Sequence, residues 1–176
     1  MYIYRNNKTI LIDGGGSITS DFDVGKKTVI PYLLDRGYTK LDYIIISHFD
    51  LDHVAGLLSV IEELKVKNVI ISKQKEDTKQ YQQFLKLVKE KKIAVTVVKR
   101  GNRIQIEKGI YFDILWPENN LMEENPLNNN SIVTQFYYNQ FSMLFTGDIE
   151  EPTEKLLLEK KINLKADILK VAHHRF

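Results

Sequence analysis

The sequence has no cysteine and no long apolar run, and these two absences exclude several classes of site. Without cysteine the chain cannot form a disulfide, use a thiol nucleophile or bind zinc through thiolates, so any metal must be held by nitrogen and oxygen atoms. The longest apolar stretches, such as Ile44–Ile46, are far shorter than the ~20 residues that span a bilayer. No segment near the start combines a basic stretch, an apolar stretch and a small-residue cleavage site, so we expect no signal peptide.

The composition that remains is that of an ordinary soluble globular protein. Of the 176 residues, 43% are hydrophobic and 27% are charged. The net charge of +2 is too small to indicate a nucleic-acid partner by itself. A chain of this length suits one domain with a sizeable core, so we expect a single domain over residues 1–176.

Short apolar runs alternate with helical patterns along the first half of the chain, and a block of strands follows. Strands are expected at 9–12, 42–47, 67–72, 93–98, 103–106, 110–116, 132–138, 141–145 and 166–171. Helices are expected at 26–36, 54–65, 78–92 and 150–160, and an Asn-rich loop is expected at 119–130. This order indicates a layered α/β fold, in which functional sites lie where strands end.

Two of the four histidines lie in the run His48-Phe49-Asp50-Leu51-Asp52-His53, directly after an expected buried strand. Two imidazoles and two carboxylates this close would raise each other's desolvation cost unless a cation were bound among them. The helix expected to follow the run would also offer backbone N–H groups to an anion. The run therefore predicts a metal site. The alternative is a solvated polar loop that happens to contain histidines.

The other candidate ligands also follow expected strands. His173 and His174 follow the last strand, and because side chains alternate along a strand only one of them is expected to face the site. Histidines at strand ends more often make only hydrogen bonds, so this pair alone is weak evidence. Asp148 follows the strand at 141–145, where a carboxylate is well placed to bridge two metals. The alternative for Asp148 is that it caps the next helix.

Together these segments resemble the metallo-β-lactamase superfamily. Residues 47–56 match its signature in the variant where an aspartate, here Asp50, replaces the second histidine, and residues 11–15, 146–148 and 173–174 resemble its other motifs. Within the superfamily, Asp50 and the runs at 129–131 and 169–174 resemble the C-terminal hydrolase domain of ComEC-type competence proteins. The resemblance implies a four-layered αβ/βα sandwich and phosphodiester cleavage of DNA in competence-type DNA uptake.

The resemblance also implies roles for individual residues. His48 and Asp50 would hold one divalent metal, and Asp52, His53 and one of the two final histidines would hold a second. Asp148 would bridge the two ions. Asp52 and Asp50 are the candidate catalytic groups. Asp52 is expected to orient the attacking water. The carboxylate-rich, thiol-free ligand set suits Mn²⁺ as well as Zn²⁺.

Two further features are candidates for contacts to the substrate. Asn130 and Ser131 could donate hydrogen bonds to a substrate phosphate, and the alternative is a plain loop-to-strand turn. A basic run could follow a DNA backbone, although such a run is more often a solvated surface, and no interleaved aromatic residues support base stacking. This run consists of Lys86, Lys89, Lys91, Lys92, Lys99, Arg100 and Arg103.

The sequence departs from the family pattern in three places. The family begins with a further strand and a Gly-Gln-Gly-Asp-like segment, continues beyond the double histidine, and usually has a histidine between the second motif and the bridging aspartate. The first two departures indicate a fragment that is incomplete at both ends.

The resemblance implies a parent protein attached to the membrane, with the hydrolase domain outside the cytoplasm. Two hypotheses compete with DNA cleavage. One is hydrolysis of another ester, such as a phosphorylcholine ester or a thioester, because this fold hosts many chemistries. The other is an inactive truncated remnant that only binds metal.

Overall fold

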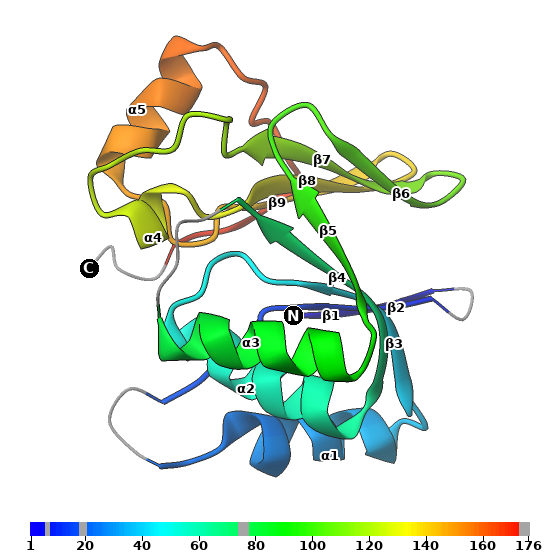
Figure 1. The fold of residues 1–176 in the computed structure, drawn as a ribbon. Coiled ribbons are helices and arrows are strands. Elements are labelled where there is room, and N and C mark those ends of the chain that lie inside the picture. The colour runs from blue at the N-terminus through cyan, green and yellow to red at the C-terminus, as the bar shows by residue number, and fades with distance from the viewer. Residues whose placement is uncertain (6–7, 18–20, 74–77, 173–176) are drawn as a thin grey trace. The chain divides into compact units, whose positions relative to one another are not determined.

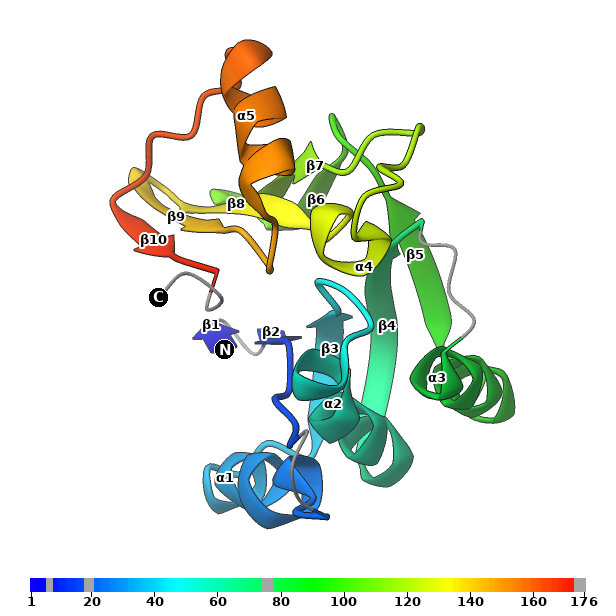
Figure 2. The same cartoon turned by 90° about the vertical axis from the view of Figure 1, so that its left-hand side faces the viewer.

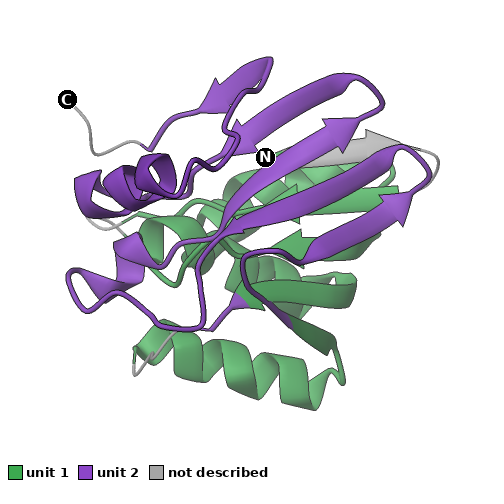
Figure 3. Cartoon of the chain, turned by 90° about the horizontal axis from the view of Figure 1, so that it is seen from above, with its two compact units in different colours: residues 1–71, 76–96 green, residues 72–75, 97–176 purple. Residues whose placement is uncertain are grey.

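The computed structural model describes residues 1–5, 8–17, 21–73 and 78–172 (Figure 1). The chain forms two compact units, one made of residues 1–71 with 76–96 and the other of residues 72–75 with 97–176 (Figure 3). Two five-stranded sheets form the frameworks of these units. Along the described residues, no helix has the length and apolarity needed to cross a membrane.

The first sheet has the strand order β1-β2-β3-β4-β5. Strands β2 (Lys8–Ile12), β3 (Lys40–Ile45) and β4 (Lys65–Ser72) run parallel to one another. Strand β1 (Tyr2–Arg5) pairs antiparallel with β2, and β5 (Ala94–Val98) forms the opposite edge. The parallel strands are rich in buried isoleucine and leucine, as is typical of parallel sheets.

Three helices gather on one side of the first sheet (Figure 1). A π-helical turn, η1 (Gly25–Val29), leads into α1 (Ile30–Asp35). Helix α2 (Leu51–Glu63) packs between this segment and α3 (Lys79–Glu90). Helix α2 is therefore the central helix of the first unit, and its N-terminus carries the histidine run.

Two helix starts refine the sequence-based expectations. The helix expected at 26–36 is present, and Pro31 lies at the start of its α-helical part, directly after the π-helical turn. Helix α2 begins at Leu51, earlier than expected. Asp52 and His53 therefore belong to the first helical turn and not to a preceding loop.

The second sheet has the order β10-β9-β8-β7-β6. Strands β6 (Arg103–Glu107), β7 (Ile110–Trp116), β8 (Val133–Tyr138) and β9 (Phe141–Phe145) form an antiparallel meander. Strand β10 (Ile168–Lys170) adds to β9 in parallel. Each of these strands was expected from the sequence at or near its observed position.

Helix α5 (Glu151–Glu159) covers one end of the second sheet (Figure 2). The Asn-rich segment is not a structureless loop, because it contains the short helix α4 (Pro126–Asn129). The indole Nε1 of Trp116 donates a 2.7 Å hydrogen bond to the carbonyl of Asn129, which ties this segment to β7. The core beneath α5 consists of Trp116, Val133, Leu144, Ile149 and Leu157.

Candidate metal centre

The histidine run lies where β3 ends and α2 begins. Asp50 is the N-cap residue of α2, and its carboxylate accepts a 3.2 Å hydrogen bond from the backbone N–H of Leu51. A carboxylate at this position also interacts favourably with the positive end of the helix dipole. Asp50 thus has a structural role besides the ligand role that the family resemblance implies.

A hydrogen-bonded network within the first unit joins Asp13 to both histidines of the run. Nδ1 of His53 lies 3.0 Å from Oδ2 of Asp13. The hydroxyl of Ser47 donates to the same Oδ2 at 2.9 Å, and the backbone N–H of Ser47 donates to Oδ1 at 2.9 Å. Oγ of Ser47 also lies 2.9 Å from Nδ1 of His48. Because the Ser47 hydrogen points to Asp13, its oxygen is left to accept from Nδ1–H of His48.

This network determines which ring nitrogens can bind a metal. With Nδ1 of His48 and of His53 engaged, Nε2 is the nitrogen that each ring can offer to a cation. The two rings lie with their centroids 4.2 Å apart. His48 is 1% exposed and His53 is 7% exposed, so the alternative of a solvated loop is wrong. Buried imidazoles held by a carboxylate and a hydroxyl are the arrangement that orients metal-binding histidines.

The charge of Asp13 is well supported. Burial alone would raise the pKa of this carboxyl, but hydrogen bonds and charge from His53, with further contributions from Ser47 and His48, lower the pKa below its ordinary value. Asp13 therefore stays ionised and favours the proton on Nδ1 of His53. Asp13 belongs to the family motif at residues 11–15, but the sequence alone indicates no role for it. The signal available was a carboxylate directly after a buried strand.

Glycines allow the segment after β2 to press against helix α2. The N–H of Gly14 donates to the carbonyl of His53 at 2.8 Å, and the N–H of Gly56 donates to the carbonyl of Gly15 at 2.8 Å. A Cβ atom on Gly56 would lie 2.3 Å from the carbonyl oxygen of Gly14, a distance that side chains do not tolerate. This close contact holds Asp13 beside the first turn of α2.

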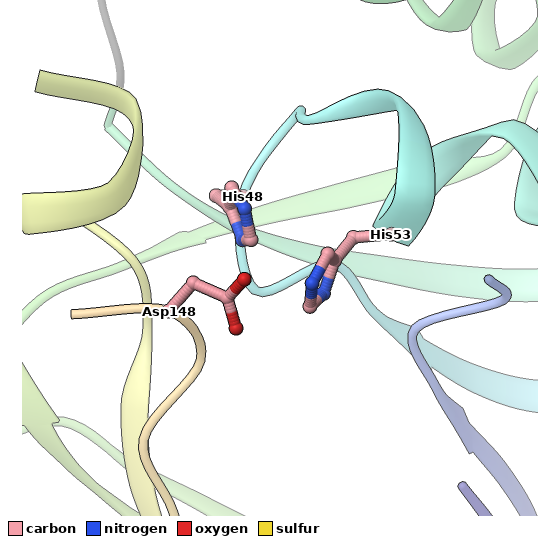
Figure 4. A group of neighbouring side chains, drawn as sticks. All are labelled: His48, His53 and Asp148. Carbon is pink, nitrogen blue, oxygen red and sulfur yellow. The ribbon is translucent and has the colours of Figure 1, made fainter. Parts of the chain in front are cut away.

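Asp148 belongs to the second unit, in the segment after β9 (Figure 4). Its side chain is buried, and its backbone N–H donates to Oγ of Ser131 at 3.4 Å. The N-cap residue of α5 is Glu150, so the alternative that Asp148 caps this helix is wrong. Figure 4 also shows His48 before α2 and His53 on the first turn of that helix. The role of Asp148 as a bridging ligand stays a prediction.

The side-chain amide of Asn130 stabilises its own loop. Nδ2 donates to the carbonyls of Met122 at 2.9 Å and Pro126 at 2.8 Å, and Oδ1 accepts from the N–H of Met122 at 2.9 Å. Asn130 thus makes the contacts expected of a loop-to-strand turn, which is the alternative to substrate binding. The substrate-binding role of Asn130 and Ser131 stays a prediction.

The remaining candidates are the two final histidines and the basic run. His173 and His174 lie outside the described residues. The basic run is divided between the units, with its first four lysines in the first unit and the rest in the second. In the second unit, Arg100 pairs with Glu118 at 2.6 Å and Arg103 pairs with Asp113 at 2.6 Å. The possible role of the run in following a DNA backbone stays a prediction.

The model of the metallo-β-lactamase superfamily matches residues 1–175. The chain belongs to this superfamily. It is 33% identical over 175 residues to ComE operon protein 3 of Bacillus subtilis (strain 168), a match that covers 94% of this chain and 22% of that protein. It is 27% identical over 172 residues to Recombination protein 2 of Haemophilus influenzae, covering 98% of this chain and 19% of that protein. These relatives confirm the likeness to the ComEC-type branch, and the chain spans about a fifth of their length.

A likeness to solved structures confirms the fold class. CmlA, a diiron β-hydroxylase from Streptomyces venezuelae, matches 96% of this chain with a TM-score of 0.59, although the sequences are only 14% identical and 31% of that chain is covered. At this level of identity the likeness concerns the fold alone. The predicted α/β metallo-β-lactamase fold is therefore present, with a five-stranded sheet and helices in each of the two units.

Proposed function

We propose that this chain is a metal-dependent phosphodiesterase that cleaves DNA. The observation that carries the proposal is the buried network of Asp13 and Ser47, which engages Nδ1 of both His48 and His53. Such a network is the support that a catalytic metal centre requires, because it selects the tautomer and orientation of each ligand. The names of the two relatives, a ComE operon protein and a recombination protein, support DNA as the substrate.

The proposed ligand set follows the family motifs. His48 and Asp50 would hold one divalent ion, and Asp52, His53 and one of the two final histidines would hold a second. The family motif assigns Asp148 as a further carboxylate ligand. The donor set contains only imidazole nitrogens and carboxylate oxygens, which suits Zn²⁺ or Mn²⁺. The described histidines fit this role because each can offer Nε2 while Nδ1 is held.

Each protein group has a defined task in hydrolysis. When bound, a pair of divalent ions lowers the pKa of water and stabilises the negative charge that grows on the phosphoryl group. Asp52 orients the attacking water and accepts its proton. Asp13 holds the proton of His53 on Nδ1, which leaves Nε2 unprotonated and able to bind a metal. Asp50 stands where the family signature has a neutral histidine. Its carboxylate is a harder donor than imidazole and makes the site more suitable for hard cations such as Mn²⁺.

The decisive experiment combines metal analysis with a cleavage assay. Bound metal is measured by elemental analysis, and cleavage of single-stranded DNA is followed with Mn²⁺ or Zn²⁺ for the parent chain and for Asp52→Ala. The matched control is Asp35→Ala, because the side chain of Asp35 is 82% exposed and lies in the same unit. We expect two metals per chain, and cleavage that is lost in Asp52→Ala and retained in Asp35→Ala.

Three outcomes would contradict the proposal. Cleavage that survives in Asp52→Ala would reveal a contaminating nuclease. Metal binding without cleavage would favour the inactive remnant that only binds metal. Hydrolysis of a phosphorylcholine ester or a thioester, with no cleavage of DNA, would show that the substrate is another ester.

A further inference from the structure

One face of the second sheet carries a column of stacked planar side chains. Arg103 on β6 lies with its guanidinium carbon 4.0 Å from the ring centroid of Tyr111 on β7. The rings of Tyr111 and Tyr137 are stacked, with centroids 4.7 Å apart and an interplanar angle of 21°. Tyr111 and Tyr137 are cross-strand partners on β7 and β8. The column therefore crosses three neighbouring strands of one sheet.

An ion pair orients the Arg103 end of the column, and the Tyr137 end lies beside a small residue. Arg103 makes two hydrogen bonds to the carboxylate of Asp113, at 2.6 and 2.8 Å, so its guanidinium is fixed over the ring of Tyr111. Both tyrosines are half-buried and keep part of their surface accessible. On the next strand, the cross-strand partner of Tyr137 is Ser142, whose small side chain does not extend the column.

A basic hollow lies beside this column within the same unit. It has a volume of about 510 Å³, and four cationic side chains line it, from Arg100, Arg103, Lys160 and Lys161. The two lysines come directly after α5, and the two arginines come from the start of β6 and the turn before it. These residues are far apart in sequence, so the hollow is a product of the fold.

Positive charge exceeds negative charge at this hollow. Glu118 pairs with both Arg100 at 2.6 Å and Lys160 at 3.2 Å, and Asp113 pairs with Arg103. These two carboxylates face four cations. Lys161 forms no ion pair with another described residue, and its side chain is exposed. The excess positive charge therefore remains available to an anionic partner.

We propose that this face of the second sheet binds single-stranded nucleic acid, with phosphates at the basic hollow and a base stacked on Tyr137. Proteins that bind single strands combine a basic groove with aromatic side chains that stack the bases. A lipid surface would contact the lysines but would not stack on the aromatic rings. The basic run in the sequence lacked interleaved aromatic residues, but the fold brings Tyr111 and Tyr137 beside Arg103 from separate strands.

The first test measures the contribution of the phosphates. Binding of a fluorescein-labelled oligothymidylate is followed by fluorescence anisotropy in EDTA, so that neither metal binding nor cleavage contributes. Lys160→Glu/Lys161→Glu is compared with Lys27→Glu/Lys40→Glu, a control pair of exposed lysines in the first unit. We expect the first pair to weaken binding about tenfold or more and to reduce the slope of log affinity against log salt by about 1.4, at ~0.7 per phosphate contact.

The second test measures the contribution of the stacked base. We expect Tyr137→Leu to weaken binding about tenfold without changing the salt slope, because stacking is not electrostatic, and Tyr137→Phe to bind as the parent does. A thermal unfolding profile establishes that each variant is folded. If Tyr137→Leu does not fold, Tyr137→Phe and Tyr137→Ser are compared by their salt slopes and affinities at a temperature where both are folded.

Five results would overturn the inference, four with nucleic acid and one with lipid vesicles. The first four are unchanged affinity in Lys160→Glu/Lys161→Glu, equal losses in the control pair, unchanged affinity in Tyr137→Leu, and equal competition by a duplex of the same length. Binding to vesicles of anionic phospholipid but not to the oligonucleotide would assign the surface to a membrane. Because the assay contains no metal, its outcome is independent of whether the proposed phosphodiesterase activity exists.

Discussion

Nδ1 of His53 lies 3.0 Å from the carboxylate of Asp13, although 40 residues separate them in the sequence. The contact joins the end of β2 to the first turn of α2, and the glycines at 14 and 56 make it sterically feasible. Ser47 shares the same carboxylate oxygen and extends the link to His48. One carboxylate thus orients both histidines of the proposed metal centre.

Replacement of Asp13 is expected to weaken metal binding. Loss of a carboxylate that orients a histidine ligand typically reduces metal affinity about 10- to 100-fold, and we expect this for Asp13→Ala. Asp13→Asn keeps a hydrogen-bond acceptor but loses the charge, so its loss should be smaller. Competition with a chromophoric chelator measures the affinities, with Asp21→Ala as the exposed control. Equal affinities for Asp13→Ala and the control would contradict the positioning role.

Two substitutions of Asp50 separate its helix-capping role from its proposed ligand role. Serine is a good N-cap residue but a poor ligand, whereas alanine can do neither. We expect Asp50→Ser to keep most of the free energy of unfolding and Asp50→Ala to lose about 1 kcal/mol. Both should lower metal affinity. Urea denaturation and metal titration are the two measurements, and full metal affinity in Asp50→Ser would leave Asp50 with the capping role only.

Gly56→Ala is expected to destabilise the chain although alanine favours helices. Alanine in a helix interior is normally about 1 kcal/mol better than glycine. Here the added Cβ would lie 2.3 Å from the carbonyl oxygen of Gly14, so the segment after β2 must move away from α2. We expect a lower free energy of unfolding and weaker metal binding, because Asp13 moves with that segment. Urea denaturation checks the first effect, with Gln82→Ala on the exposed face of α3 as control. A stabilised Gly56→Ala would show that the contact relaxes without cost.

Asp42 makes a pH-dependent contribution to stability. Its carboxylate is buried and accepts hydrogen bonds from the N–H of Thr9 at 3.1 Å and from Nζ of Lys67 at 2.6 Å. Burial alone would raise the pKa of Asp42, but these hydrogen bonds and the charge of Lys67 lower it below its ordinary value of 3.8. Because the folded state favours the ionised form, the contribution is complete well above pH 3.8 and is lost as the pH falls below that value.

Asp42→Asn should therefore be less stable than the parent chain near neutral pH, by about 1–3 kcal/mol. The difference should shrink as the pH falls below 3.8, the usual pKa of the carboxyl. Urea denaturation at several pH values measures it, with Asp35→Asn as the exposed control. A difference that is constant from neutral to acidic pH would show that the charge of Asp42 has no part in it.

The elements that bury apolar side chains were predictable from the sequence. The strands of the second sheet and helices α3 and α5 appear close to their expected positions, because runs such as Ile110–Trp116 alternate between buried and partly buried residues. The histidine run was also predictable, because ligand-type residues at this density are unusual after a buried strand. Strand β1 was not predicted, since pairing between β1 and β2 depends on a partner strand and not on an apolar pattern in Tyr2–Arg5.

The contacts between distant residues could not be predicted in the same way. Local patterns do not indicate that Asp13 meets His53, or that Tyr111 stacks on Tyr137, because both contacts depend on strand register and on the packing of loops. Helix α2 begins at Leu51 and not at Val54, because Asp52 and His53 are part of its first turn. Asp50 as N-cap, followed by Leu51, would have indicated the earlier start.

The burial of Trp116 allows the unfolding of each unit to be followed by its own spectroscopic signal. It is the only tryptophan in the sequence, and it is 2% exposed in the core of the second unit. Emission excited at a wavelength that tyrosine does not absorb therefore reports the second unit alone, whereas far-ultraviolet circular dichroism is dominated by the helices of the first. Coincident transitions in the two signals would indicate that the chain unfolds as one cooperative whole, and separated transitions would indicate two independent folding units.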